Sequence, residues 1–134
     1  HHNRKFMRLT GMDVGEHQAA RLLADLDTWR ATNGLEDIPL EEAAHEWITD
    51  VFTPVVRAIP RELAGKLEPA QLYHEYLEHR WYMAQQAGHD VTRDEALASY
   101  IETILPSKRD EAVLIEPGPG RSSIFSAESN PDLW

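Results

Sequence analysis

The sequence contains no cysteine, which excludes disulfides, thiolate nucleophiles and cysteine-ligated metals. It has no run of about eighteen apolar residues, the length that a membrane-spanning helix needs. Seven glycines and eight prolines are too few for a collagen-like or low-complexity chain. No apolar segment of the signal-peptide type follows the basic start of the chain. Together these absences predict a cytoplasmic protein without a membrane span.

Basic residues are scarce relative to acidic ones. Thirteen lysines and arginines stand against 23 aspartates and glutamates, and the formal net charge is −10 at pH 7. A field of that sign repels nucleic-acid phosphates and anionic lipids. The charge balance therefore argues against a nucleic-acid-binding protein.

The 134 residues are enough for one domain with a buried core. We expect a tag remnant and basic lead-in over residues 1–8, a helical domain over 9–106 and an extended tail over 107–134. The two leading histidines are typical of an expression tag. Residues 113–115 are apolar and could form a short strand, but an extended course against the helical body is the favoured interpretation.

Apolar residues recur at helical spacing in four segments, which predicts helices over residues 13–33, 40–58, 68–87 and 93–105. Short loops between amphipathic helices favour an antiparallel arrangement. The predicted fold class is therefore all-α, an irregular antiparallel bundle of about four helices with an extended C-terminal tail. Its largest core candidates are Trp29, Trp47 and Trp81.

Local signals bound these helices. Asp13 and Thr92 are candidate N-caps, and the sequence from Thr92 to Glu95 is typical of a capping box. Gly34 and Gly88 are candidate C-caps. Pro54 interrupts the second segment, so we expect a kink or break near Phe52 and Thr53. Residues 60–65 could add one further turn.

The segment from His74 to His79 resembles the helical zinc signature H-E-x-x-H, but its histidines are five residues apart. On a helix they diverge by roughly 140°, so they cannot share one metal ion. Glu75 and His79 are four residues apart and are expected to form an exposed or half-exposed pair that raises the pKa of the histidine.

Glu42 and His45 form an E-x-x-H spacing like that of di-iron bundles, but a second copy is missing. The favoured interpretation is a solvated face, and both residues are also ligand or partner candidates. The surrounding segment 36–50 is acidic without a lysine or arginine. This composition indicates a solvated face or, alternatively, a docking surface for a basic partner.

The third predicted helix carries a cluster of ionisable and aromatic side chains. They could form a ligand or peptide pocket, or only the polar shoulder of a packed helix. The ligand or partner candidates there are Glu75, Glu78, His79, Arg80 and Tyr82.

No catalytic residue is predicted. No G-x-S-x-G motif surrounds a serine, and the GPGRS segment lacks the order and the lysine of a phosphate-binding loop. We also expect no metal and no cofactor.

Several stretches carry a family resemblance: LTGMDVGEHQAARLLADLDTWRA, HEWITDVFTPVVRAIP, LEPAQLYHEYLEHRWYMAQQAGHDV and DEALASYIETILP. Over residues 9–106 the chain resembles the bacterial family called domain of unknown function 4032. The resemblance implies a C-terminal accessory domain of longer proteins whose preceding region looks like a lipopolysaccharide kinase. It supplies no catalytic residues for this chain.

The favoured function is a non-catalytic helical accessory or interaction module excised from a larger kinase-like protein. Its partner would be the neighbouring kinase-like domain, another protein or a second copy in a homo-oligomer. The alternative is a small-ligand-binding or enzymatic domain that uses the Glu/His/Tyr cluster on the third long helix.

Overall fold

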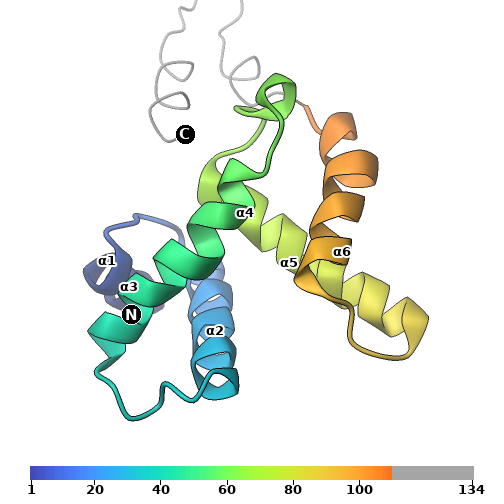
Figure 1. The fold of residues 1–134 in the computed structure, drawn as a ribbon. Coiled ribbons are helices and arrows are strands. Elements are labelled where there is room, and N and C mark those ends of the chain that lie inside the picture. Colours follow the sequence, from blue (N-terminus) through green and yellow to red (C-terminus); the bar gives the residue numbers. More distant parts are fainter. Residues whose placement is uncertain (110–134) are drawn as a thin grey trace, which may run out of the picture. The chain divides into compact units, whose positions relative to one another are not determined.

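The computed structural model describes residues 1–109, and every element within that range is helical (Figure 1). The all-α class is therefore confirmed. The predicted tail, with its strand candidate at residues 113–115, lies beyond residue 109 and so almost entirely outside the described part. The chain divides into two compact units, His1–Val55 and Val56–Trp134.

The first unit begins with a helix that the sequence patterns did not predict, α1 (His2–Thr10). Its only buried residue is Phe6, which is fully enclosed. The cap of α1 comes from the next helix, α2 (Glu16–Thr32). The Glu16 carboxylate accepts hydrogen bonds from the backbone N–H groups of His2 and Asn3, each at 3.1 Å. A cap so distant in sequence leaves no local start signal.

Trp47 is the centre of this unit. It ends α3 (Leu40–Trp47) and is fully buried, as predicted. Its indole Nε1 donates a hydrogen bond to Asp25 Oδ2 at 3.0 Å, and its ring lies against Phe6 and Phe52, with centroid separations of 6.3 and 5.6 Å. Trp47 thus joins α3 to α1 and the following turn through aromatic contacts, and to α2 through the hydrogen bond to Asp25.

Beyond α3 the helix continues as a π-helical turn, η1 (Ile48–Phe52), and then as α4 (Thr53–Arg57). The Thr53 N–H donates to the Ile48 carbonyl, a wider spacing than in an α-helix. Pro54 has no N–H to donate, so the preceding turn is where the regular ladder is lost. The disturbance predicted near Phe52 is therefore a local change of helix type rather than a break.

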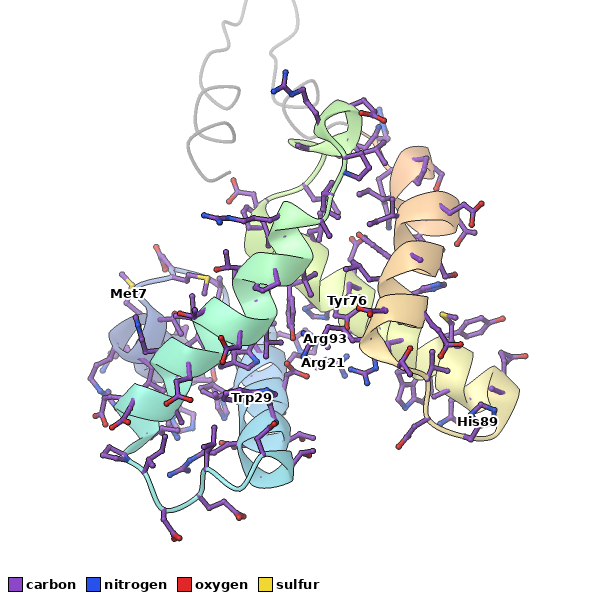
Figure 2. The ribbon with its side chains drawn as sticks, in the orientation of Figure 1. Met7, Arg21, Trp29, Tyr76, His89 and Arg93 are labelled. Carbon is purple, nitrogen blue, oxygen red and sulfur yellow. The ribbon has the colours of Figure 1, made fainter. Side chains whose placement is uncertain are left out.

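The second unit contains α5 (Pro69–Ala87), α6 (Arg93–Ser99) and a second π-helical turn, η3 (Tyr100–Ile104). Gly88 closes α5 in the left-handed conformation, with φ of 78°, as predicted. His89 follows in the connection to α6 (Figure 2). The remaining elements are short 3₁₀ turns, η2 (Arg61–Leu63) and η4 (Leu105–Ser107).

The predicted capping box at Thr92 is confirmed. The Thr92 hydroxyl accepts from the Glu95 N–H at 3.1 Å, and the Glu95 carboxylate accepts from the Thr92 N–H at 3.2 Å. This reciprocal pair satisfies donors at the start of α6 that would otherwise lack partners.

The inward placement predicted for Trp81 is wrong, because this residue is 62% exposed. Burial along α5 ends at Tyr76. Trp81 lies roughly 80° around the helix from the buried Tyr73, at the edge of the apolar face of α5. The contacts of α6 and the loop before it reach α5 through His79 and Arg80, on the other flank. The apolar spacing in the sequence does not show that the C-terminal half of this face is left exposed.

Candidate functional site

A hollow of about 340 Å³ lies on the second unit, between the middle of α5 and the end of the described chain. We call it the α5 hollow. Four of its lining residues are sequence-predicted candidates on α5. The full lining is Glu75, Glu78, His79, Tyr82, Ile104 and Lys108.

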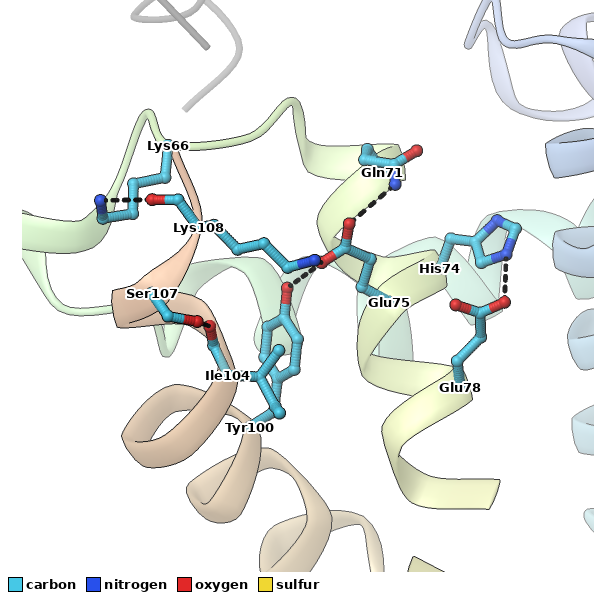
Figure 3. A network of polar contacts seen from close by, with 9 residues as sticks. All are labelled: Lys66, Gln71, His74, Glu75, Glu78, Tyr100, Ile104, Ser107 and Lys108. Carbon is cyan, nitrogen blue, oxygen red and sulfur yellow. Dashed lines mark hydrogen bonds and ion pairs between the residues drawn. The ribbon is translucent and has the colours of Figure 1, made fainter. Parts of the chain in front are cut away.

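Glu75 is the most connected side chain of the α5 hollow (Figure 3). Its Oε1 accepts a hydrogen bond from the Tyr100 hydroxyl at 3.2 Å and lies 3.2 Å from Lys108 Nζ. Its Oε2 accepts from Gln71 Nε2 at 2.9 Å. With a side chain only 14% exposed, this carboxylate is fixed by three groups from three parts of the unit.

Tyr100 positions Glu75 from beneath. It opens the π-helical turn η3 and is fully buried. Burial raises the pKa of Tyr100, and the charge and hydrogen bond of Glu75 raise it further. The phenol therefore stays protonated and remains a donor to the carboxylate at all ordinary pH values.

Lys108 is held where its side chain can reach Glu75. Its carbonyl oxygen accepts a hydrogen bond from Lys66 Nζ at 2.9 Å, and the preceding Ser107 donates to the Ile104 carbonyl at 2.8 Å (Figure 3). These contacts place the lysine ammonium at the hollow, although the sequence patterns assign this position to the tail.

The predicted pair of Glu75 and His79 is wrong. His79 Nε2 instead lies 2.8 Å from the Ser99 hydroxyl on α6, and burial lowers the pKa of His79 rather than raising it. The i,i+4 pair that does form joins His74 Nε2 to Glu78 Oε2 at 3.3 Å (Figure 3). The spacing of acids and histidines therefore predicts an ion pair on the correct helix but between the wrong residues.

Arg80 has a different environment. Its Nε donates to the Val91 carbonyl at 2.9 Å and so ties α5 to the loop before α6. It does not belong to the lining of the α5 hollow. Its guanidinium fixes the connection between two helices.

Glu42 and His45 are both exposed on α3 in the first unit. The whole lining of the α5 hollow comes from the second unit. These two candidates thus contribute no side chain to it.

Sequence reasoning missed Ile104, Lys108, Ser99 and Tyr100 as site residues. Tyr100 and Ile104 lie in the helix predicted over residues 93–105, where the sequence shows only apolar residues at helical spacing. The π-helical turn sets their direction, and no local sequence signal announced that turn.

Within residues 1–109, no three His, Asp or Glu side chains form a group able to hold a metal ion. None of the helices in that range combines the length and apolar character needed to cross a membrane.

Comparison with known proteins places the chain in a family. No curated protein and no solved structure matches it. Residues 1–105 match a family described as a domain of unknown function, a range that begins before the predicted start at residue 9 and includes α1. All residues of the α5 hollow except Lys108 fall inside the match. The chain therefore belongs to the family of the domain of unknown function DUF4032.

Proposed function

We propose that this chain is a non-catalytic interaction module that binds a protein partner at the C-terminal half of α5. One observation carries the proposal. Trp81 and Tyr82, adjacent on α5, are 62% and 55% exposed. Large aromatic side chains with a polar edge are enriched at protein interfaces, because they bury much area at little entropic cost.

The partner we favour is a neighbouring kinase-like domain, which the family resemblance implies. In that setting the chain acts as an accessory domain. A second copy of the chain would use the same aromatic surface and is the alternative occupant.

The contacts of the α5 hollow favour binding over catalysis. His79 and Ser99 approach the spacing of a base and a nucleophile, at 2.8 Å. A nucleophilic enzyme needs a third group that orients the base. The two carboxylates of the hollow have other partners, since Glu75 bonds to Tyr100 and Glu78 to His74.

A small-ligand site is the second candidate function. The observation that favours it is the convergence of Glu75, Glu78, His79 and Tyr82 on one hollow of about 340 Å³. That volume is within the range of small-molecule pockets.

Photo-cross-linking tests the interaction module. A photoreactive phenylalanine analogue is placed at Gln85, an exposed position of α5, and at Thr28, an exposed control position of α2. We expect one discrete cross-linked species from position 85 and none from position 28. The double variant Trp81→Ala, Tyr82→Ala should lose that species while keeping its helical spectrum.

The mass of the cross-linked species identifies the partner as a second copy or another protein. An unchanged yield from the double variant would remove the proposal. Equal yields from positions 85 and 28 would do the same, since they would indicate non-specific encounter.

A further inference from the structure

We infer that the α5 hollow binds the ammonium group of a lysine side chain from the partner, and that Lys108 holds this place in the free protein. The inference rests on the proposed function, because it identifies the chemical group of the partner that the interaction module recognises. Four properties of the hollow support it: its fixed carboxylate, its charge balance, the one oxygen it offers to a cation, and its open aromatic wall.

Glu75 requires a cation. Its side chain is 14% exposed, and a carboxylate so withdrawn from water is costly unless it is paired and hydrogen-bonded. Tyr100 and Gln71 are neutral donors, so the positive charge comes from Lys108. Any group that replaces Lys108 must therefore bring a positive charge of its own.

The charge balance of the lining also selects a cation. Glu75 and Glu78 are acids and Lys108 is the basic residue of the lining. Burial lowers the pKa of His79, so its imidazole is neutral at pH 7. The lining thus carries a net negative charge, which attracts a cation and repels an anionic ligand.

The contacts of Glu75 favour lysine over arginine. Gln71 donates to Oε2, whereas Oε1 accepts from the Tyr100 hydroxyl and also faces the cation Lys108. A guanidinium binds a carboxylate best through both oxygens at once. An ammonium is a compact point charge that needs only one, and one is what the site presents.

Lys108 can be exchanged for another cation. Its side chain is 38% exposed, so its ammonium can return to water while an incoming ammonium takes its place beside Glu75. The hollow of about 340 Å³ holds roughly ten water volumes, enough for an ammonium and its carbon stem. The ring of Tyr82 lines the hollow and is half exposed, which offers a cation a face to contact.

The test is a titration of the ¹⁵N-labelled full chain with short blocked peptides, followed by nuclear magnetic resonance. One peptide has a central lysine, and the others have arginine, norleucine or Nε-acetyl-lysine there. We expect the lysine peptide to shift the amides of residues 75, 82 and 108. Its Kd should be at least about tenfold lower than those of the norleucine and acetyl-lysine peptides.

Two variants test the roles of the charged pair. Lys108→Met should strengthen binding of the lysine peptide by roughly three- to tenfold, because it removes the internal competitor. Glu75→Gln should weaken it by about tenfold or more. Glu102→Gln, on the exposed face of η3, is the matched control and should leave the Kd unchanged. If Glu75→Gln fails to fold, Lys108→Met alone decides the question.

Equal affinity for the lysine and norleucine peptides, or weaker binding by Lys108→Met, would overturn the inference. Preference for arginine over lysine would overturn it as well. The two experiments separate this inference from the proposed function. If a partner is cross-linked but the peptides show no preference for lysine, the interaction module is supported and the lysine site is not. If the lysine peptide binds but no partner is cross-linked, the hollow is a ligand site and the interaction module is not supported.

Discussion

The hydroxyl of Tyr100 donates a hydrogen bond to Glu75 Oε1 across 3.2 Å, from a π-helical turn to the middle of α5. The phenol is fully buried and the carboxylate is nearly so. This bond fixes the direction of Glu75, so the same carboxylate can face Lys108 at the surface. The wall of the α5 hollow is therefore anchored in the core of the second unit.

Tyr100→Phe should destabilise the protein by about 1 kcal/mol, because it removes the hydroxyl but keeps the ring in place. Urea denaturation followed by circular dichroism measures this free energy of unfolding. Tyr82→Phe is the control, since its ring is 55% exposed and its loss of a hydroxyl should change stability very little. Equal effects of the two variants would contradict the role given to the Tyr100 hydroxyl.

The two tryptophans Trp47 and Trp81 should respond oppositely to truncation. Trp47→Ala removes a fully buried ring and the hydrogen bond to Asp25, and should cost about 3–5 kcal/mol. Trp81→Ala should cost less than about 0.5 kcal/mol, as is usual for exposed positions. Thermal melts of both variants decide this. A large fall in Tm for Trp81→Ala would show that this ring packs in the core.

The helices were predictable where their signals are local. The capping box of Thr92 and Glu95 spans four residues, and Gly88 lies directly after the helix that it ends. The stripe that includes Ala44, Trp47 and Val51 repeats at helical spacing and is buried. Such features involve neighbours along the chain, so the sequence alone suffices for them.

The site was predictable only in part, because its contacts are non-local. Glu75 is bonded by Tyr100 and Lys108, which are 25 and 33 residues away along the chain. α1 likewise depends on Glu16, a cap supplied from the next helix. Trp81 fits a helical stripe, but the stripe does not tell how far along α5 a partner helix covers it.

The junction of α1 and α2 should weaken in acid. Hydrogen bonds from the backbone of Asn3 and from His2 lower the pKa of Glu16 to about 2 from 4.5. A folded-state pKa below the unfolded one means that the stabilisation is complete above pH 4.5 and is lost as the pH falls toward 2. The protection factors of the amides of residues 2–6, which are the exchange rates of an unfolded chain divided by their own at the same pH, should therefore fall over that window.

Glu16→Ala tests the origin of this acid sensitivity. In this variant the protection factors of residues 2–6 should already be low at pH 6 and should not fall further in acid. Glu41→Ala is the matched control, because Glu41 is exposed in the first turn of α3. Persistent protection of α1 in Glu16→Ala would exclude the carboxylate as its cap.

His79 should make the stability of the protein depend on pH. Burial lowers the pKa of His79 from 6.5, so the unfolded chain binds its proton more readily than the folded one. The free energy of unfolding should therefore fall as the pH drops through 6.5 toward the lowered folded value, and level off below it. This is the opposite sign to that of a histidine stabilised by a carboxylate. Denaturant titrations between pH 5 and pH 8 measure the slope in the range where histidine titrates.

His79→Gln should flatten that slope, since glutamine does not titrate, and can still hydrogen-bond to Ser99. His89→Gln is the control, because His89 is exposed in the loop after α5 and should leave the slope as it is. A histidine that instead gained stability on protonation would make the protein more stable at pH 5 than at pH 8. That result would restore a carboxylate partner for His79 and place a second cation inside the α5 hollow.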